Sequence, residues 1–338
     1  MPFAKLPDEL GDAFSVRAAL NAGVSLSRLR GADLERPFHA ARTRRIALDA
    51  DANLTHHSER QRAEVMHRAH AYGALMQPHQ FFSHETAAIM WGIPLPWLQD
   101  TDPHVGVFRP ERLPRSRGIH GHETLTSLCD VMRHPDLGVM LTTPASTWAM
   151  LGAVLRDEYD LVAAGDAVIR IPRMPGGYTK DVGSAMASLA TVTAAVDAGR
   201  RVGRPALRVA LERLRTGSSS RPETWCRLLL VDAGLPEPQL DVDVYDERDG
   251  EFIGCVDLAY PELRIAIEYE GDQHRTSPAQ WQRDIDKYDR LAAAAGIAGE
   301  SGTSRGCATA GRNARLRLGL SRYLRIGGWL VNPRHPRS

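Results

Sequence analysis

The stretch from Cys255 to His274 constrains the fold of this chain more than any other segment. Two apolar runs flank a turn that contains a proline, and acidic residues are spaced along the second run. Because side chains alternate between the two faces of a strand, Glu268 and Glu270 share one face and Ile267 lies on the other. The pattern predicts a β-hairpin whose second strand has one apolar and one acidic face.

The register of this hairpin brings two carboxylates together. If the turn centres on Glu262 and Leu263, Asp257 lies directly opposite Glu268. Facing carboxylates repel each other, and a hard cation such as Mg²⁺ removes that repulsion, because it prefers one or two carboxylates with water and substrate phosphate. The hairpin therefore indicates phosphodiester chemistry. The alternative is a solvated edge strand, whose charges protect a sheet from aggregation.

Composition sets broad limits. The chain has 338 residues, of which 43% are hydrophobic, and this is typical of a soluble protein with two or three domains. The net charge of +1 creates no global field toward nucleic acid, so a polyanion site has to be local. No signal peptide and no membrane-spanning run are predicted. The cysteines lie far apart, which argues against a zinc site or disulfide framework and is typical of a cytoplasmic protein: Cys129, Cys226, Cys255 and Cys307.

Charge is unevenly distributed along the C-terminal half. Eight arginines and two acids lie from Arg200 to Arg227, whereas thirteen acids and two arginines lie in residues 232–272. The arginines could hold a phosphate backbone beside a metal ion in the acidic segment. The alternative is that they form the solvated face of a helix.

The N-terminal residues 14–45 predict a helix, a turn at Gly23, a second helix and a short basic extended segment. Ser15 and Ser25 are suited to cap the two helices. This order is typical of a winged helix-turn-helix, although two short helices joined at a glycine also occur in unrelated proteins. The predicted DNA-binding residues are Arg28 and Arg30 on the recognition helix and Arg42, Arg44 and Arg45 on the wing.

The middle of the chain predicts a small α+β domain. One helix is expected to be capped by Ser83 and ended by Gly92. His84 and Glu85 invite a catalytic interpretation, but a first-turn helix position with a favourable dipole explains Glu85 better. Strands are expected at 104–108 and 118–122, and further helices near 144 and 161 and over 184–198, 205–215 and 222–234.

The C-terminal region carries a more specific set of residues. Glu223 lies on a predicted helix, Asp257 and Glu268 lie on the hairpin, and Gly271-Asp-Gln-His274 follows. With this string, residues 220–291 resemble the very-short-patch-repair-like endonuclease domains of the PD-(D/E)XK superfamily. The resemblance implies an α/β restriction-endonuclease-like domain, with a mixed sheet flanked by helices.

The same resemblance implies a role for each residue of the site. Asp257 and Glu268 would coordinate Mg²⁺ or Mn²⁺, and Glu223 would reach the ion directly or through water. The metal would lower the pKa of bound water, so that hydroxide attacks the phosphorus. His274 would transfer protons, and Lys287 would stabilise charge on the phosphate. The expected catalytic residues are Glu223, Asp257, Glu268, Glu270, His274 and Lys287.

Two features depart from the superfamily pattern. Members often carry lysine two residues after the motif glutamate, where this chain has Glu270, and an acid cannot stabilise the developing phosphorane charge. From about residue 292 the tail is rich in Gly, Ser, Thr and Arg and lacks the alternating apolar run that such a fold needs next. One hypothesis is that a shift of reading frame replaced the original end.

The N-terminal region resembles AbiEi-type antitoxin regulators, through the helix-turn-helix pattern and the segment Ser83-His-Glu-Thr-Ala-Ala. Those proteins bind DNA as repressors. The expected organisation is a winged-helix-like region over 1–60, a small α+β domain over 61–180, a helical linker over 181–219 and the endonuclease-like domain over 220–338.

The sequence thus predicts a Mg²⁺-dependent DNA endonuclease of the restriction or repair type. The alternative is a non-catalytic, antitoxin-like DNA-binding regulator with a degenerate nuclease domain, and Glu270 and the unusual tail favour it. DNA is the expected partner, and assembly into a homodimer is compatible with the sequence. No toxin partner can be inferred from the sequence.

Overall fold

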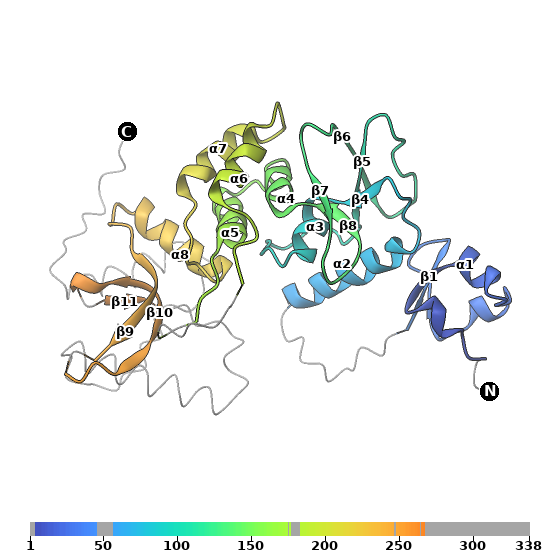
Figure 1. The fold of residues 1–338 in the computed structure, drawn as a ribbon, viewed down its shortest axis with the longest axis horizontal. Coiled ribbons are helices and arrows are strands. Elements are labelled where there is room, and N and C mark those ends of the chain that lie inside the picture. The colour runs from blue at the N-terminus through green and yellow to red at the C-terminus, as the bar shows by residue number, and fades with distance from the viewer. Residues whose placement is uncertain are drawn as a thin grey trace. The chain divides into compact units, whose positions relative to one another are not determined.

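The computed structural model describes residues 4–45, 57–174, 176, 183–246, 248–263 and 265–267 (Figure 1). The chain is an α+β protein that divides into two compact units. The first unit consists of residues up to 161 together with 187–211, and the second consists of 162–186 together with residues from 212 onward. None of the helices in these described ranges combines the length and the apolar character that a membrane crossing needs.

The first unit begins with a small antiparallel sheet in the strand order β1-β3-β2. Ser15 caps the first helix as predicted, because its hydroxyl accepts a hydrogen bond from the backbone of Ala18 at 3.0 Å. Phe14 and Leu29 are buried in the core of this region. The elements are η1 (Asp8–Leu10), β1 (Ala13–Ser15), α1 (Val16–Asn21), η2 (Arg28–Arg30), β2 (Leu34–Glu35) and β3 (Ala41–Arg44).

The second helix expected in this region is a single 3-10 turn, η2. The Ser25 hydroxyl accepts a hydrogen bond from the backbone of Arg28 at 3.2 Å, so the predicted capping serine does start the turn. Gly31 follows directly, and glycine is a poor helix residue, which ends the turn after three residues. A recognition helix of ordinary length is therefore absent from the described residues 24–35.

The centre of the first unit is a five-stranded mixed sheet in the order β6-β5-β4-β8-β7, with helices packed against it (Figure 1). The pairs β5–β6 and β4–β8 are parallel, and the pairs β4–β5 and β7–β8 are antiparallel. The strands are β4 (Gln80–Phe82), β5 (His104–Phe108), β6 (His120–Thr124), β7 (Val131–Arg133) and β8 (Met140–Thr142). The helices are α2 (His57–Gly73), α3 (His84–Met90), α4 (Pro144–Leu151), α6 (Leu189–Asp197) and the start of α7 (Arg204–Arg213).

Apolar side chains from three strands and two helices fill the space between sheet and helices. Phe82, Val105 and Leu141 come from β4, β5 and β8, and all three are fully buried. They belong to one cluster with Tyr72 of α2 and Ala87 of α3. This packing fixes the start of α3 beside the start of β5.

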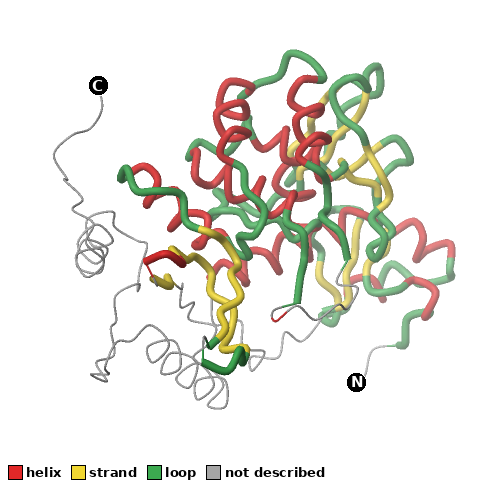
Figure 2. The backbone as a smooth tube through the Cα atoms, turned by 60° about the vertical axis from the view of Figure 1, so that its left-hand side comes forward, coloured by secondary structure: helices red, strands yellow, loops and turns green. Residues whose placement is uncertain are grey.

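The second unit contains a three-stranded antiparallel sheet in the order β11-β10-β9, and β9 and β10 run side by side as a long hairpin (Figures 1 and 2). Leu230 of the helix α8 packs against Leu258 of the central strand. The elements are the end of α5 (Glu158–Ile169), α8 (Arg221–Asp232), β9 (Gln239–Tyr245), β10 (Phe252–Tyr260), η4 (Pro261–Leu263) and β11 (Ile265–Ile267).

The register of the predicted hairpin is confirmed. Leu258 pairs with Ile267 and Tyr260 pairs with Ile265, as expected for a turn centred on Glu262 and Leu263. Several predicted site residues, and the tail from about 292, lie outside the described residues: Glu268, Glu270, His274 and Lys287.

Candidate functional site

Glu223 lies in the first turn of α8, and its carboxylate is tied to the start of that helix. Ser220 is the N-cap residue, and its hydroxyl donates a hydrogen bond to Glu223 Oε1 at 2.8 Å while accepting one from Glu223 N. Glu223 Oε2 accepts a further hydrogen bond from the backbone of Ser219 at 2.6 Å. These bonds form a capping box with one change, namely that the carboxylate accepts from the backbone of Ser219, the residue before the N-cap. The acid is held by three hydrogen bonds and is only 8% exposed.

Asp257 on β10 is the second acid beside this helix. Burial and then the negative charge of Asp257 raise the pKa of Glu223 to about 7. The two acids lie on packed elements, because Leu230 of α8 and Leu258 of β10 belong to one buried cluster, and their charges interact through the space between helix and strand. The structure thus brings two of the six predicted catalytic residues within electrostatic range of each other.

The register of the sheet places another acid next to Asp257. The pairs Val242–Val256 and Leu240–Leu258 put Asp241 of β9 opposite Asp257. On the other side of β10, the predicted partner of Asp257 is Glu268, which lies outside the described residues.

Arg173, from the segment after α5, binds the acids of β9. Its Nε lies 2.6 Å from Asp241 Oδ2, and its Nη1 lies 2.9 Å from Asp243 Oδ2. Cys255 Sγ lies 2.9 Å from Asp241 Oδ1, and burial and then Asp241 raise the pKa of this thiol to about 12. Asp241 has a φ of 52°, a strained value for a residue other than glycine. The local sequence around Arg173 gives no sign of this contact, because its partners lie 68 and 70 residues further along the chain.

Four of the five arginines predicted to contact DNA are engaged within the chain. Arg28 donates to Asp33 through both Nη atoms, at 2.9 and 2.6 Å. Arg42 donates to the backbone carbonyls of Leu29, His39 and Ala41, and Arg44 donates to those of Gly11 and Pro7. Arg45 pairs with Glu35 at 3.6 Å, but its side chain is exposed, and an exposed pair of this kind is weak. Arg30 is exposed as well, so Arg30 and Arg45 are the predicted phosphate contacts that remain accessible.

The arginine-rich segment from Arg200 to Arg227 is a network of paired charges. Arg221 stacks on the ring of Trp225, with 4.9 Å from the guanidinium carbon to the ring centroid. The ion pairs join Arg204 and Arg208 to Asp197, Arg213 to Asp232, Arg215 to Glu237, and Arg227 to Asp166 and Glu237. These pairings favour the interpretation of the segment as a helix face over its interpretation as a basic arm whose arginines hold phosphate.

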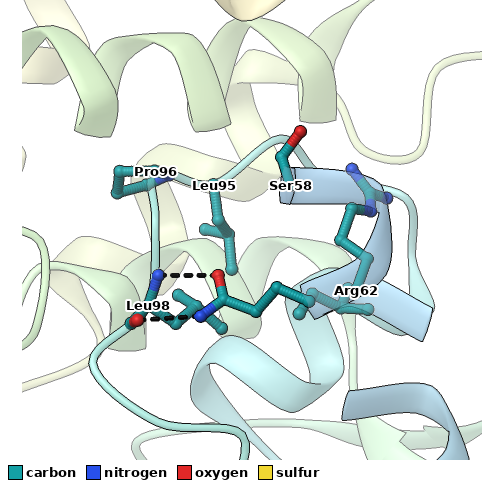
Figure 3. A pocket seen from close by; sticks show the side chains of 7 residues that line it. Ser58, Arg62, Leu95, Pro96 and Leu98 are labelled. Atoms are coloured by element: carbon teal, nitrogen blue, oxygen red, sulfur yellow. Dashed lines mark hydrogen bonds between the residues drawn. The ribbon is translucent and has the colours of Figure 1, made fainter. Parts of the chain in front are cut away.

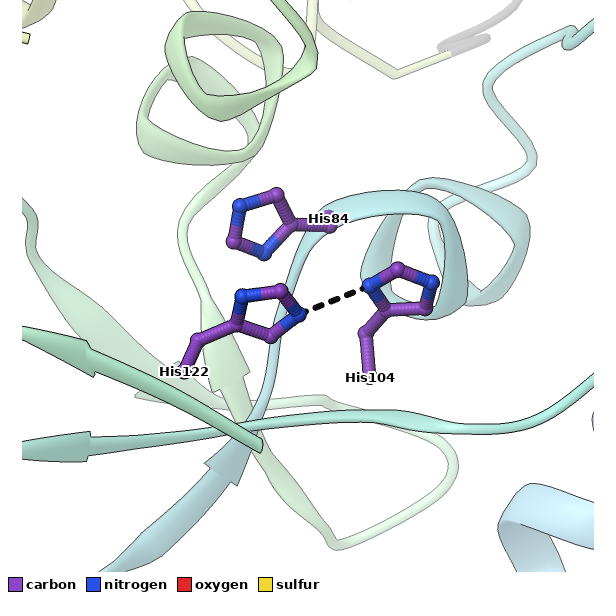
Figure 4. A group of neighbouring side chains, drawn as sticks. All are labelled: His84, His104 and His122. Carbon is purple, nitrogen blue, oxygen red and sulfur yellow. Dashed lines mark hydrogen bonds between the residues drawn. The ribbon is translucent and has the colours of Figure 1, made fainter. Parts of the chain in front are cut away.

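A group of histidines that the sequence analysis did not connect lies at one end of the five-stranded sheet (Figure 4). His84 begins α3, His104 begins β5, and His122 lies in the neighbouring strand β6. His104 Nδ1 and His122 Nε2 are 2.9 Å apart, and the rings of His84 and His122 stack with centroids 3.9 Å apart. In the described ranges, two groups of side chains could each hold a metal ion by proximity, namely His84-His104-His122 and Asp100-Asp102-His120.

The three rings are neutral at pH 7. Burial, with a smaller contribution from neighbouring histidines, lowers the pKa of His104 to about 3 and that of His122 to about 4. The same two causes hold the pKa of His84 well below its ordinary value. Each ring therefore carries a nitrogen lone pair at neutral pH.

A small cavity lies between the start of α2 and the segment after α3 (Figure 3). Gln61 closes it, because its amide donates to Leu98 O at 2.8 Å and accepts from Leu98 N at 2.9 Å. The cavity of about 20 Å³ has room for about one water molecule, so it is a packing feature and not a substrate site. Its lining consists of Ser58, Gln61, Arg62, Ile89, Leu95, Pro96 and Leu98.

No protein-family profile matches the chain, and no solved structure is significantly similar to it. Two curated proteins of Mycobacterium tuberculosis, the uncharacterized proteins Rv2248 (strain H37Rv) and MT2308 (strain CDC 1551), are 34% identical to it over 74 residues. This stretch is 22% of the chain and 27% of each relative, so the chain spans about a quarter of the length of the curated relatives it matches. Neither name states an activity.

Proposed function

We propose that the second unit is a Mg²⁺- or Mn²⁺-dependent DNA endonuclease domain of the restriction or repair type, with a restriction-endonuclease-like fold. The observation that carries this proposal is the packing of α8, which bears Glu223, against β10, which bears Asp257, together with the electrostatic interaction between the two acids. A helix and a central strand would thereby offer two acids to one ion.

These residues fit a divalent cation, because two buried or half-buried carboxylates that repel each other are stabilised by an ion between them. Glu223 and Asp257 would hold the ion, with Glu268 as the third predicted ligand. When bound, the ion would polarise a phosphoryl oxygen and lower the pKa of its water. The capping box would keep Glu223 in one rotamer, which favours a fixed site over a mobile one.

DNA contact would come from the N-terminal region, for which we propose a winged-helix-like module in which the 3-10 turn η2 takes the place of the recognition helix. The order of strand, helix, turn and hairpin, with the sheet order β1-β3-β2, supports this proposal. The exposed side chains of Arg30, on η2, and Arg45, directly after β3, would contact phosphates.

A second candidate function is an antitoxin-like transcriptional regulator that binds DNA without cleaving it. The capping box favours this candidate, because it accounts for the presence of Glu223 without a metal ion. In this case the N-terminal region would act alone and the acids of the second unit would have a structural role.

Nicking of supercoiled plasmid by the full chain tests the leading proposal. We expect cleavage with Mg²⁺ or Mn²⁺, loss of cleavage on chelation, and loss in Asp257→Asn. Glu262→Gln is the matched control, because Glu262 is an exposed acid on the turn of the same hairpin. Equal cleavage by the wild type and Asp257→Asn would rule out the site, and salt-dependent DNA binding without cleavage would favour the regulator.

A further inference from the structure

We infer that His84, His104 and His122 form a binding site for a transition-metal ion of the zinc class in the first unit. This inference does not depend on the proposed nuclease function. One ligand nitrogen from each ring lies within 4.8 Å of the others. Three rings from a helix start and two parallel strands thus lie side by side, with His84 stacked on His122 and His104 at the edge of His122 (Figure 4).

Two of the three nitrogens, those of His104 and His122, are spaced nearly as in a tetrahedral site. Zinc–nitrogen bonds of about 2.0–2.1 Å separate neighbouring ligand nitrogens by about 3.4 Å. His104 Nδ1 and His122 Nε2 are 2.9 Å apart, and the hydrogen bond between them requires one ring to donate. If the two rings moved about half an ångström further apart, an ion would fit between them, and two nitrogen–metal bonds would replace the hydrogen bond.

A carboxylate lies beside one of the three rings. His104 Nδ1 is 2.9 Å from His122 Nε2, and its Nε2 is 3.2 Å from Glu85 Oε2, a buried oxygen that accepts no hydrogen bond from the described residues. The negative charge of this carboxylate favours the tautomer in which Nε2 carries the proton and Nδ1 carries the lone pair, as in carboxylate–histidine–metal triads. His84 Nδ1 lies 3.0 Å from the Ser83 hydroxyl, and this nitrogen is on the side of the ring that faces His122 (Figure 4).

Backbone strain at His84 gives a separate indication of function. Its φ of 47° lies in the left-handed region, which residues other than glycine seldom adopt. This conformation occurs at the first residue of α3 and presents the imidazole to the ring of His122. Strain of this kind persists where the surroundings enforce it, and it is concentrated at binding sites.

The donor set identifies the class of metal. Imidazole nitrogens suit Zn²⁺, Cu²⁺, Ni²⁺ and Co²⁺, whereas Mg²⁺ and Ca²⁺ require oxygen. Three protein ligands leave one position for water, which is the pattern of catalytic zinc sites. The His104 side chain is 14% exposed, so an ion can reach it from solvent.

The adjacent group of Asp100, Asp102 and His120 is a weaker candidate for the ion. Asp102 is paired with Arg68. Asp100 Oδ1 and Oδ2 each lie 3.1 Å from His120 Nε2. The ring of His120 lies 4.6 Å from that of His104, so these acids provide negative charge beside the three histidines.

Titration of the metal-free full chain with Co²⁺ tests this inference, because tetrahedral Co²⁺ with nitrogen ligands gives strong visible absorption bands. We expect one equivalent to bind per chain, displacement by Zn²⁺, and a higher Tm with Zn²⁺. All arms are repeated in an Asp257→Asn background, so that an ion held by the carboxylates of the second unit is not counted.

His104→Ala and His122→Ala should each abolish the bands and the Zn²⁺-dependent rise in Tm. The matched control is His70→Ala, which removes an exposed histidine from α2 and should bind as the wild type does. The inference is overturned if the wild type shows no Co²⁺ bands, or if His104→Ala and His122→Ala show bands as strong as those of the wild type.

A conservative variant decides the question if either alanine variant fails to fold by circular dichroism. Glu85→Gln keeps the shape of the side chain but removes the negative charge beside His104 Nε2. We assign Glu85 as a positioning residue and not as a ligand. We expect its Zn²⁺ affinity to fall by about 10–100-fold with the fold unchanged. An unchanged affinity overturns the assignment.

Discussion

Asp166 of α5 and Arg227 of α8 form an ion pair at 2.9 Å in which each side chain is only 1% exposed. Asp166 also accepts hydrogen bonds from the backbone of Arg215 and the hydroxyl of Thr224. Arg227 also donates to Glu237, at 2.8 Å. A buried charge is tolerated only when it is paired and hydrogen-bonded, so this network defines how α8 packs on α5.

Removal of one partner should therefore unfold the second unit at lower denaturant concentration. Asp166→Ala leaves the guanidinium of Arg227 buried without its main counter-ion, and we expect a loss of about 3–5 kcal/mol in the free energy of unfolding. Urea denaturation followed by circular dichroism measures this loss. Asp232→Ala breaks the exposed ion pair with Arg213 and should cost about 0–1 kcal/mol. Equal losses in the two variants would contradict the structural role of the buried pair.

Gly106 lies in the middle of β5, opposite Phe81 of β4. A Cβ atom at this position would overlap the ring of Phe81, so only glycine allows the ring to lie across the strand. We expect Gly106→Ala to destabilise the first unit by about 1–3 kcal/mol through overpacking. Thermal denaturation measures the effect. Gly73→Ala is the control, because its added methyl would meet only Val139 at 3.9 Å, and a similar fall in Tm there would contradict the explanation.

Local signals in the sequence were sufficient for several elements. Ser15 marks the start of a helix through its capping hydrogen bond, and Gly92 marks the end of a helix through its positive φ. Such features depend on a few neighbouring residues. The strand at 104–108 and the register around η4 follow from alternation and turn position, which are equally local.

Other features depend on contacts between distant parts of the chain. The strands β4, β7 and β8 are three residues long, which is too short to establish an alternating pattern. His104 and His122 become neighbours only because β5 and β6 pair in parallel, and nothing in either segment specifies that pairing. Arg173 reaches Asp241 across 68 residues, so its role is visible only in the folded chain.

The two exposed arginines of the N-terminal region should determine its affinity for DNA. Each phosphate contact that is lost lowers the slope of log affinity against log salt by about 0.9. We therefore expect Arg30→Ala and Arg45→Ala each to reduce the slope by about one unit in fluorescence anisotropy with a labelled duplex. Arg17→Ala, an exposed change on α1, should leave the slope unchanged. A slope that is the same in all three variants would place the DNA contact elsewhere.

The arginines engaged in hydrogen bonds should behave differently from the exposed pair. Arg42 donates to three backbone carbonyls, so Arg42→Ala leaves these acceptors without their partner. We expect a loss of roughly 1–3 kcal/mol in stability. The salt slope of the folded variant should be that of the wild type. A slope reduced by about one unit, with stability unchanged, would instead make Arg42 a phosphate contact.

Glu223 should make the stability of the metal-free protein depend on pH. Its pKa is about 7 in the folded chain, and the ordinary value is 4.5. Between these values the folded chain holds a proton that the unfolded chain has released, so the free energy of unfolding decreases as pH rises through this window. The contribution of Glu223 is fully present below the lower value and is lost above the higher one. A shift of this size corresponds to roughly 3 kcal/mol.

Urea denaturation with chelator at about pH 5 and about pH 8 measures this dependence. Glu223→Gln cannot ionise, so it should remove the decrease, whereas Glu262→Gln changes an exposed acid and should retain it. Asp257→Asn removes the charge that helps to raise the pKa of Glu223. The pH range over which stability falls should therefore become narrower and the total fall smaller, but the fall should persist, since burial is the larger cause of the raised pKa. A decrease of the same size in Asp257→Asn and the wild type would mean that the two carboxylates are not coupled, and the proposed metal site would lose its main support.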